Sequence, residues 1–433
     1  MSTSRRPPAW LLALALAAFA VQTDDFIIIG VLPAIASDIH VSESAAGQLV
    51  TAYSLVYALT APIWAILFAR VPRRRALFWA LTTFTGANAA VLLVDVYPVL
   101  MALRVVAALA ASVVLPTALA AASTQAPPDR RGRYLALVMM GLTGAILAGV
   151  PLGTWVGALL GWKATFAFGG LMGGLSLLLG LATLPAGADA TDEERRTFAD
   201  LLRPLFDRAV AVVLILTILT VAGNLAFQTY IAVILSGLAG VTPSVLGVLL
   251  VCSGVGGLLG TQASGRLVDR FGALRSFLAA GAVFGLAMAG LALLWLVSPV
   301  PVWGVAPILM VWSAAAWAVP PSLQALMLDR AGAEAASQAM AVHSSSVYVG
   351  AAVGGVLGGA AIAVSPGLVP AAAAAAAVLG LALSPLARRP GGQGADRPRV
   401  VPAADGLRGQ TGPGAGDAGA CSGRPNAGGR GDR

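Results

Sequence analysis

The stretch "AWLLALALAAFAVQTDDFIIIGVLPAI", residues 9–35, decides the class of this protein. Its only charged residues are two adjacent acids, Asp24 and Asp25. A helix needs about 20 apolar residues to cross the ~30 Å hydrocarbon core of a bilayer. The stretch exceeds the roughly 7–15 residues of a signal-peptide core and lacks a convincing cleavage site. We therefore expect a retained first membrane span.

The composition of the whole chain extends this interpretation. Hydrophobic residues make up 58% and charged residues 11%, whereas a soluble protein carries about 25% charged residues. The formal net charge is +8, but most basic residues lie in short loops between apolar runs, which is a topology signal. We expect a lipid bilayer around the chain and no nucleic-acid partner. Cys252 and Cys421 form no disulfide framework and no metal site.

The same length criterion predicts twelve spans along the chain. They cover residues 9–35, 45–69, 75–95, 98–124, 132–160, 163–184, 209–236, 244–267, 274–297, 302–328, 335–364 and 368–387. Regions 98–124 and 132–160 are longer than one crossing needs, so we expect tilted helices there. The predicted fold class is an all-α membrane protein with twelve transmembrane helices.

The placement of arginine predicts the orientation of these spans, because cytoplasmic loops carry an excess of Lys and Arg. With the N-terminus inside, the outside loops hold a single basic residue, Lys163. The inside loops hold Arg5, Arg6, Arg70, Arg73, Arg74, Arg75, Arg130, Arg131, Arg133, Arg195, Arg196, Arg203, Arg208, Arg266, Arg270, Arg275, Arg330, Arg388 and Arg389. Both termini are therefore expected to be cytoplasmic.

An internal repeat divides the chain into two halves. "AILFARVPRRR" from Ala65 aligns with "GRLVDRFGALR" from Gly265 at an offset of 200 residues. The predicted seventh span begins about 200 residues after the first, so we expect two pseudo-symmetric six-helix bundles. The expected segments are a cytoplasmic N-terminus (1–8), an N-terminal bundle (9–184), a cytoplasmic linker (185–208), a C-terminal bundle (209–387) and a disordered cytoplasmic tail (388–433).

The loop after the second span of each half carries a motif. The second copy reads G-x-x-x-D-R-x-G, with Gly265, Asp269, Arg270 and Gly272. It resembles the cytoplasmic loop signature of the major facilitator superfamily. The first copy departs from that signature because Ala69 replaces the aspartate and both glycines are lost. It keeps the basic residues Arg70, Arg73 and Arg74.

Two further stretches narrow the resemblance. "ALRVVAALAASVVLP" (102–116) resembles the family's fourth helix, and "GLTGAILAGVPLGTWVGALLGWKATFAF" (141–168) resembles its fifth-helix antiporter signature. With "DDFIIIGVLPAIASDIHVS" (24–42), the chain is similar to the twelve-helix drug–proton antiporter branch, which includes bacterial chloramphenicol exporters and arabinose-efflux-like permeases. The resemblance implies a bacterial inner-membrane exporter of small molecules that is driven by the proton gradient.

Asp24, Asp25 and Arg104 are the clearly intramembrane charges, and a charge at this depth is a functional-site hypothesis by default. Arginine keeps its proton, whereas a carboxyl group withdrawn from water can take one up. The two acids point about 100° apart on a helix. Either can carry the proton, or one can simply lock Arg104 in place. In the resembled branch an acid commonly precedes phenylalanine, which favours Asp25 before Phe26.

A second group of residues is expected to line the substrate cavity. At the 200-residue offset Asn224 aligns with Asp24, and Gln228 follows one turn later. Tyr53 and Tyr57 are also one turn apart, and a histidine lies in the eleventh span. The alternative is interhelical hydrogen bonding or plain packing. The candidate cavity residues are Tyr53, Tyr57, Asn224, Gln228 and His343.

The fifth span carries glycines at spacings of four or eight residues, which places them on one helix face. Small residues let helices approach closely, and a proline bends a helix. We expect a tightly packed, kinked span that gates the passage at the seam between the halves; the alternative is ordinary packing. The residues are Gly141, Gly149, Pro151, Gly153 and Gly157.

Motifs for other functions are missing from the sequence. There is no phosphate-binding GxxxxGK[ST] motif, no paired His/Cys spacing for a metal, and no Ser/His/Asp set. We expect no enzyme activity and no cofactor, with the proton gradient as energy source. The main hypothesis is a monomeric exporter of a small amphiphilic or hydrophobic compound by proton antiport. A sugar or nucleoside-like exporter is the alternative, and a non-transporting membrane sensor is a third hypothesis.

Overall fold

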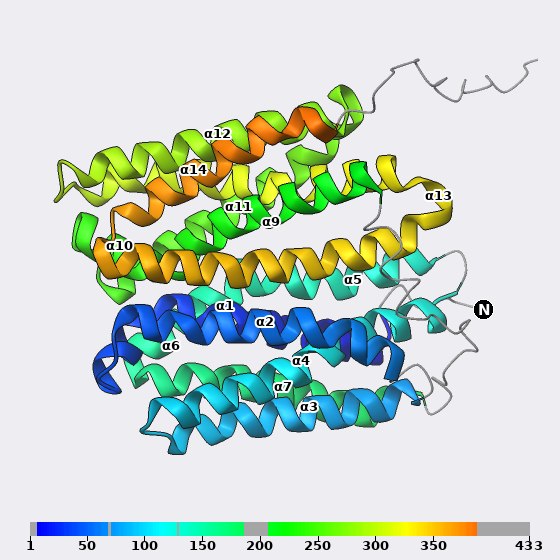
Figure 1. The fold of residues 1–433 in the computed structure, drawn as a ribbon. Coiled ribbons are helices and arrows are strands. Elements are labelled where there is room, and N and C mark those ends of the chain that lie inside the picture. Colours follow the sequence, from blue (N-terminus) through cyan, green and yellow to red (C-terminus); the bar gives the residue numbers. More distant parts are fainter. Residues whose placement is uncertain (1–6, 68–70, 128–129, 186–206, 388–433) are drawn as a thin grey trace, which may run out of the picture. The chain divides into compact units, whose positions relative to one another are not determined.

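The computed structural model describes residues 7–67, 71–127, 130–185 and 207–387, and within these ranges the chain is helical (Figure 1). The first half contains α1 (Ala9–Asp38), α2 (Glu43–Leu67), α3 (Arg73–Ala90), η2 (Val91–Leu93), α4 (Tyr97–Gln125), α5 (Arg131–Gly144), η4 (Ala145–Gly149), α6 (Val150–Leu160) and α7 (Trp162–Thr183). The second half contains α9 (Arg208–Thr229), α10 (Ile231–Ala239), α11 (Pro243–Phe271), α12 (Ala273–Trp295), α13 (Val302–Val364), α14 (Leu368–Leu383) and η6 (Ser384–Ala387).

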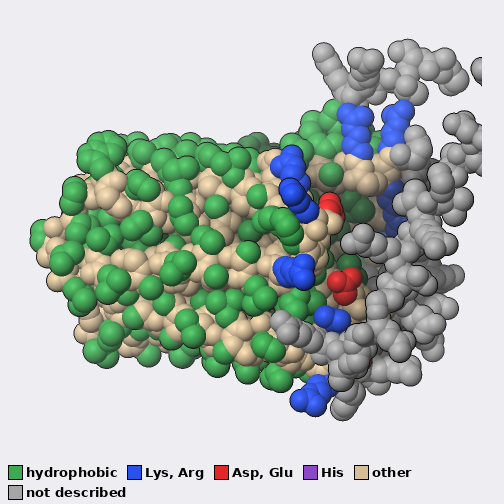
Figure 2. Space-filling view, turned by 90° about the horizontal axis from the view of Figure 1, so that it is seen from above, with side chains coloured by type: hydrophobic (Ala, Val, Ile, Leu, Met, Phe, Trp, Pro, Cys, Tyr) green, Lys and Arg blue, Asp and Glu red, His purple; other side chains and the backbone are tan. Residues whose placement is uncertain are grey.

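The helices have the length and surface of membrane spans. Eleven helical segments in the described ranges are long and apolar enough to cross a bilayer. The 25-residue α2 is not one of these eleven, but it is a further helix that packs on α1, α4 and α13, so each predicted span corresponds to a helical segment. Figure 2 shows hydrophobic side chains over the flank of the helices. Large apolar side chains such as Leu93 and Trp303 are 87% and 85% exposed, as expected for a protein surrounded by lipid rather than water.

The two ends of the helices differ in charge. We call one the basic end, because arginines gather there, as Figure 2 shows. It carries Arg73, Arg74, Arg131, Arg133 and Arg270. The opposite end, which we call the far end, carries the turns after α1, α3 and α6. Lys163 lies there and forms a 2.6 Å ion pair with Asp95.

The helices pack as two bundles that meet along two seams. In the first bundle α1 packs on α4, α5 and α7, and α3 packs on α4 and α7. In the second bundle α13 packs on α9, α11 and α12, while α14 packs on α9 and α12. One seam joins α2 to α13, which run side by side in Figure 1. The other joins η4 and α6 to α11. The fold thus matches the predicted pair of six-span bundles.

The second bundle contains two local changes of direction. Residues 302–328 and 335–364, predicted as two separate spans, form the two parts of α13, Val302–Gly332 and Gln338–Val364, which are separated by a non-helical kink at Gly332. Gly332 has φ 75°, a conformation that favours glycine. Span 209–236 is broken at Tyr230 into α9 and α10. Hydropathy predicts the apolar length of a span but not such local changes of direction.

Span 132–160 is interrupted by the π-helical turn η4. Pro151, just after this turn, has no N–H to donate to the carbonyl of Leu147 four residues earlier, so regular α-helical bonding fails there. The predicted bend of this span therefore has its physical cause in Pro151. The predicted N-terminal segment, linker and tail (1–8, 185–208 and 388–433) lie wholly or mostly outside the described residues.

Candidate functional site

The first bundle contains a buried ion pair between α1 and α4. Arg104 donates from Nη1 to Asp24 Oδ2 at 2.8 Å and from Nη2 to the backbone oxygen of Asp24 at 3.3 Å. Both side chains are fully buried. A buried charge is costly unless it is paired and hydrogen-bonded. The two-point contact meets that condition and fixes the relative position of the two helices.

Aromatic rings surround the guanidinium of Arg104. Its Cζ lies 4.4 Å from the ring centroid of Tyr53 on α2 and 5.5 Å from that of Phe166 on α7. Cations are attracted to the faces of such rings. Tyr53 is completely buried. The positive charge of Arg104 is therefore committed to Asp24 and to these two rings.

Gly169 on α7 lies beside the ion pair. A Cβ there would make an ordinary 3.5 Å contact with Asp24 Oδ1. Asn88 on α3 is also buried and donates to the backbone oxygen of Phe84 at 3.1 Å. The pair thus lies in the middle of the first bundle, enclosed by helices of that bundle.

Asp25 points in a different direction from Asp24, as expected for neighbours on a helix. Its side chain is 8% exposed, so it is nine-tenths buried. It lies within electrostatic range of Arg104 and Asp24, and also of Tyr57 on α2 and Tyr348 on α13. Among the described residues, no group is hydrogen-bonded to its carboxylate. Asp25 is a buried acid that faces the seam between the bundles.

Tyr57 and Tyr348 form a stacked pair across that seam. Their ring centroids are 3.9 Å apart with an angle of 21° between the planes. Tyr57 belongs to the first bundle and is buried, while Tyr348 belongs to the second and packs on the same cluster of buried side chains. This contact joins α2 to α13 near the level of Asp25.

The second bundle contributes neutral polar groups. Asn224 on α9 donates from Nδ2 to Gln228 Oε1 at 3.3 Å, and it accepts from Trp312 Nε1 at 3.1 Å. Asn224 and Gln228 are only half-buried. The structure therefore brings the two predicted amides together with an unpredicted partner on α13. At the 200-residue offset Asn224 aligns with Asp24 of the first bundle.

His343 is placed apart from the aspartates. It is 2% exposed, and its Nδ1 lies 3.3 Å from Thr217 Oγ1 on α9. Its backbone oxygen accepts from Ser346 Oγ at 2.7 Å. The histidine thus joins α13 to α9 inside the second bundle.

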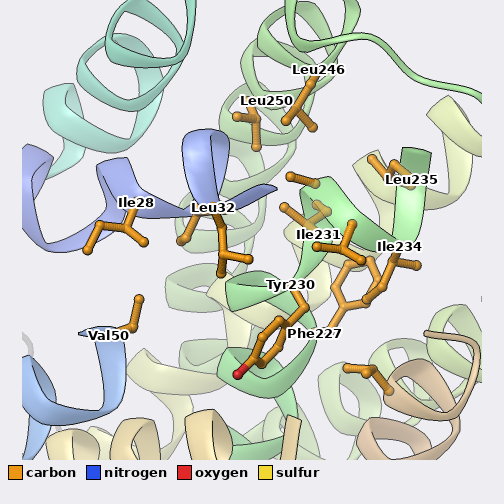
Figure 3. Close-up of a cluster of buried hydrophobic side chains, with 14 of the residues drawn as sticks. Ile28, Leu32, Val50, Phe227, Tyr230, Ile231, Ile234, Leu235, Leu246 and Leu250 are labelled. Atoms are coloured by element: carbon orange, nitrogen blue, oxygen red, sulfur yellow. The ribbon is translucent and has the colours of Figure 1, made fainter. Parts of the chain in front are cut away.

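A cluster of buried apolar side chains from both bundles lies toward the far end, near the turn between α1 and α2. Figure 3 shows part of this cluster. We call it the far-end seal. Figure 3 labels its members Ile28, Leu32, Val50, Phe227, Tyr230, Ile231, Ile234, Leu235, Leu246 and Leu250. They come from α1, α2, α9, α10 and α11, so the seal joins the two bundles through side chains that water does not reach.

Tyr230 ties the far-end seal to the α2–α13 seam. Its hydroxyl lies 3.4 Å from the backbone oxygens of Ser44 and Gly355. A Cβ at Gly358 would lie 2.8 Å from Tyr230 Cε2, so glycine at this position makes room for the ring. At the other seam, Trp155 Nε1 donates to the backbone oxygen of Ser244 at 3.1 Å. Both seams are therefore closed toward the far end.

The polar groups lie about one helical turn from this seal. Asp25 precedes Ile28 by three residues on α1, and Asn224 precedes Phe227 by three residues on α9. Three residues advance a helix by roughly 4.5 Å. The acid of one bundle and the amides of the other are therefore at similar depth, on the basic-end side of the seal.

The glycine face of the fifth span packs on α1, within the same bundle. Cβ atoms at Gly141, Gly149, Gly153 and Gly157 would meet Ala15, Thr23, Ile27 and Val31 of α1 respectively. The span touches the other bundle elsewhere, where the Leu147 backbone approaches Gly254 of α11. The predicted common face exists, and its partner is α1. Whether the span gates a passage stays a prediction.

We expect Gly149→Ala to destabilise the protein by about 1–3 kcal/mol, because overpacking a filled core costs that much. A Cβ there would clash with Thr23 Oγ1 and lie 3.1 Å from Phe19 Cζ. Gly144→Ala is the matched control, since its Cβ would make an ordinary 3.6 Å contact with Phe19. Thermal unfolding in detergent measures both variants. Equal unfolding temperatures would contradict the close packing of α1 on this span.

The loop-motif residues lie at the basic end. Arg73 donates to Thr124 Oγ1 at 2.6 Å, and Arg74 donates to the backbone oxygen of Leu181 at 2.9 Å. These contacts hold the start of α3 against α4 and α7 of the same bundle. In the second copy Asp269 and Arg270 are exposed. Arg70 lies outside the described residues.

In the second copy, Gly272 ends α11 with φ 85°, where other residues are strained. Gly265 is exposed, and a Cβ there would meet nothing within 4 Å. The structure thus gives a conformational reason for one glycine of the motif, Gly272, and no steric reason for the other.

Sequence reasoning did not predict several residues around the site. Phe166, Trp312 and Tyr348 are aromatic residues inside apolar spans, and nothing in the hydropathy distinguishes them from other packing residues. The available signal for Tyr348 was its position in "SSSVY", the polar stretch that follows His343.

Comparisons with known proteins agree with this architecture. A family model described as "Major Facilitator Superfamily" matches residues 14–355. The chain is 33% identical over 376 residues to the "Inner membrane transport protein YdhP" of Escherichia coli K12, covering 86% of this chain and 94% of that protein. It is 36% identical over 273 residues to a "Chloramphenicol resistance protein" of Streptomyces lividans, covering 61% and 67%.

Two solved structures share the fold at low sequence identity. The nucleoside transporter NupG aligns with a TM-score of 0.74 and 12% identity, covering 87% of this chain and 99% of that chain. A D-xylose–proton symporter aligns with a TM-score of 0.70 and 16% identity, covering 87% and 96%.

Two apolar helical bundles with buried charges define a multi-pass membrane protein. The family model matches residues 14–355 of this chain, and the alignment with YdhP covers 86% of it. The chain belongs to the Major Facilitator Superfamily, a family of membrane transporters.

Proposed function

We propose that this transporter exports a small amphiphilic or hydrophobic compound in exchange for protons. The observation that carries the proposal is Asp25, an acid that is nine-tenths buried and has no hydrogen-bond partner among the described residues. It faces the seam between the two bundles, where a major facilitator protein binds its substrate. The relatives named for inner-membrane transport and chloramphenicol resistance support export.

The charge balance around Asp25 explains why a proton is needed. Asp24 and Arg104 neutralise one another at 2.8 Å. If Asp25 is ionised, the three buried side chains Asp24, Asp25 and Arg104 together carry one uncompensated negative charge. Such a charge is costly inside a membrane protein. A proton on Asp25 removes that charge, and a substrate that displaces the proton must supply its own favourable contacts. Competition of this kind couples the two binding free energies.

The arrangement of the seams supports alternating access. The far-end seal and the Tyr230 contacts close the passage toward one face. Two bundles that rock about a central site would separate these contacts and close others at the basic end. Asp25 on α1, about one turn from the seal, would then meet water from one side at a time.

We propose a monomer in the bacterial inner membrane, with the basic end and both termini in the cytoplasm. The labelling test replaces Asp95, whose side chain is 84% exposed at the far end, or Gly132, exposed at the basic end, by cysteine. Cys252 and Cys421 are first replaced by serine. We expect a membrane-impermeant maleimide to label the Asp95→Cys protein on intact cells and the Gly132→Cys protein only in inverted vesicles. The reverse pattern would overturn the orientation.

The function is tested with purified protein in liposomes that carry a pH gradient. Amphiphilic compounds, antibiotics among them, are offered as a panel, and both compound flux and proton flux are recorded. We expect at least one compound to move against the proton flow only when the gradient is present. Proteoliposomes that move neither protons nor any compound would favour a non-transporting sensor instead.

A second candidate is export of a sugar or nucleoside-like metabolite. The Asn224–Gln228–Trp312 group favours it, because amides hydrogen-bond the hydroxyl groups of such substrates. The same liposomes, loaded with sugars and nucleosides, distinguish the two candidates. Gradient-dependent movement of these polar compounds, without movement of amphiphilic ones, would select the second.

A further inference from the structure

We propose that an apolar hollow in the flank of the first bundle binds one anionic phospholipid. The hollow lies between α1, α3 and α7 at the basic end, and Arg74 is part of its lining. The lipid phosphate pairs with Arg74 and Arg75, and one acyl chain lies in the hollow. Only residues of the first bundle line it, so the inference is separate from the transport proposed at the seams.

The lining of this basic-end hollow is almost entirely hydrocarbon. Leu14 of α1, Phe78 of α3 and Leu177 of α7 contribute to it. Ser176 also lines the hollow, but its hydroxyl donates to the backbone oxygen of Ala13 at 2.9 Å and is thereby satisfied. The hollow therefore offers apolar contacts that suit an acyl chain.

A glycine keeps the hollow open. A Cβ at Gly180 of α7 would find Ala13 Cβ at 4.0 Å and no closer neighbour from the other described helices. Leu181, the next residue of the lining, is 39% exposed, so the hollow opens onto the flank of the bundle. Because that flank faces lipid rather than water, a tail reaches the hollow directly from the bilayer.

Two arginines beside the hollow have donors to spare. Arg74 donates from Nη2 to the backbone oxygen of Leu181 at 2.9 Å, which satisfies a carbonyl in the last turn of α7. Among the described residues Arg74 makes no further hydrogen bond or ion pair, and the exposed Arg75 makes none. Arg73, by contrast, is committed to Thr124 Oγ1 at 2.6 Å. Arg74 and Arg75 can therefore bind an anion.

The described part of the first bundle places no acid at the basic end. Its acids lie inside the bundle or at the far end and are Asp24, Asp25, Asp38, Glu43 and Asp95. The first copy of the loop motif also lacks an acid, since Ala69 stands where the second copy has Asp269. The two arginines thus carry positive charge that the described part of the bundle does not balance.

Charge and shape together select an anionic phospholipid. Arginine binds phosphate through paired, charge-assisted hydrogen bonds. A soluble anion has no tail for the hollow, and a zwitterionic lipid brings its own cation to the arginines. Basic pockets between spans on the cytoplasmic side of a membrane bind anionic head groups. The basic end is the one that we propose to face the cytoplasm.

The test compares phosphatidylglycerol with phosphatidylcholine that carries the same acyl chains. Native mass spectrometry measures binding of each lipid to the purified full chain in detergent. We expect the anionic lipid to bind one site about 10-fold more tightly, because each arginine contributes to the attraction. Arg74→Gln with Arg75→Gln should weaken phosphatidylglycerol binding about 10-fold and phosphatidylcholine binding less than roughly twofold.

Matched controls separate this site from the general charge of the basic end. Arg133→Gln with Arg275→Gln also removes two exposed arginines at that end, but neither lines the hollow, so binding should change less than roughly twofold. The unfolding temperature without lipid shows that each variant folds. Equal binding of the two lipids, or equal losses in the two double variants, would overturn the proposal.

A glycine pair tests the place of the acyl chain. Gly180→Leu fills the hollow and should weaken phosphatidylglycerol binding about 10-fold, because tail contacts are lost. Gly86→Leu is the control, since a Cβ at this exposed position of α3 would also meet nothing close. Unchanged binding in a folded Gly180→Leu protein would overturn the proposal. So would equal competition by glycerol phosphate, which has the head-group charge and no tail.

The acids of the linker are the alternative partner for the two arginines. Asp192, Glu193 and Glu194 follow α7 in the chain and lie outside the described residues. Replacing them by Asn, Gln and Gln should leave phosphatidylglycerol binding within roughly twofold, if the lipid is the partner of the arginines. A rise of about 10-fold would show that the linker occupies the arginines, and would overturn the proposal.

Discussion

Asp25→Asn is expected to lower proton-driven export by roughly 100-fold while the protein still inserts in the membrane. Asparagine has nearly the same shape as aspartate but cannot exchange a proton. Coupling free energies between two ligands of one protein are about 1–3 kcal/mol, and the loss corresponds to the upper part of that range. Asp25 has no hydrogen-bond partner among the described residues, so the amide breaks no contact of the fold. Compound flux along a pH gradient in liposomes measures the effect.

Asp95→Asn is the matched control for this experiment. Asp95 is an exposed acid at the far end that pairs with Lys163, remote from the seam. Surface ion pairs contribute only ~0–1 kcal/mol, so export should change less than about twofold. Downhill flux of the compound without a gradient should survive in the Asp25 variant, because substrate still reaches the site. Full gradient-driven export by both Asp24→Asn and Asp25→Asn would exclude a carboxylate mechanism.

Arg104→Leu is expected to destabilise the protein by about 3–5 kcal/mol. Removing one partner of a buried ion pair leaves the other charge uncompensated, and that is the typical cost. Here the remaining charge would be Asp24, which is fully buried and loses the 2.8 Å contact. Thermal unfolding in detergent and the yield of inserted protein both report the loss.

A second variant shows whether the cost comes from charge. Combining Arg104→Leu with Asp24→Asn removes both charges, and replacing a buried pair by neutral groups is often nearly neutral for stability. We expect the double variant to recover most of the unfolding temperature. A double variant that is as unstable as Arg104→Leu alone would mean that Arg104 stabilises the bundle mainly by its packing against Tyr53 and Phe166.

Much of the fold was predictable because a bilayer constrains a chain strongly. Apolar length alone predicts where each span lies, and the 200-residue repeat predicts two bundles. The break between spans 302–328 and 335–364 was predicted, and the kink at Gly332 falls within it. The break at Tyr230 was not predictable in the same way, because a tyrosine in an apolar run is compatible with a straight helix and only the packing of neighbouring helices decides. Pro151 was the exception, since its missing N–H predicts a bend.

The charged residues of the candidate site were predictable from the sequence, because charges are rare inside membrane spans. Asp24, Asp25 and Arg104 stand out in apolar spans, but helical geometry left open which acid contacts the arginine, and the structure assigns that contact to Asp24. Their neighbours and the other aromatic residues of the site, Phe166, Trp312 and Tyr348, were not predictable in this way, because uncharged aromatic residues are common in apolar spans. The spacing of the fifth-span glycines predicts a common face but not the helix that it meets. A partner in space is a property of the tertiary fold, which a local pattern does not contain.

The far-end seal gives the protein a temperature dependence. Its members are almost entirely hydrocarbon, from Ile28 and Leu32 on α1 to Leu246 and Leu250 on α11. Parting them exposes apolar surface to water, which raises the heat capacity and costs less free energy in the cold than at higher temperature. The contact between the two bundles at this end is therefore expected to tighten as the protein warms, because solvent entropy favours the buried state of these side chains.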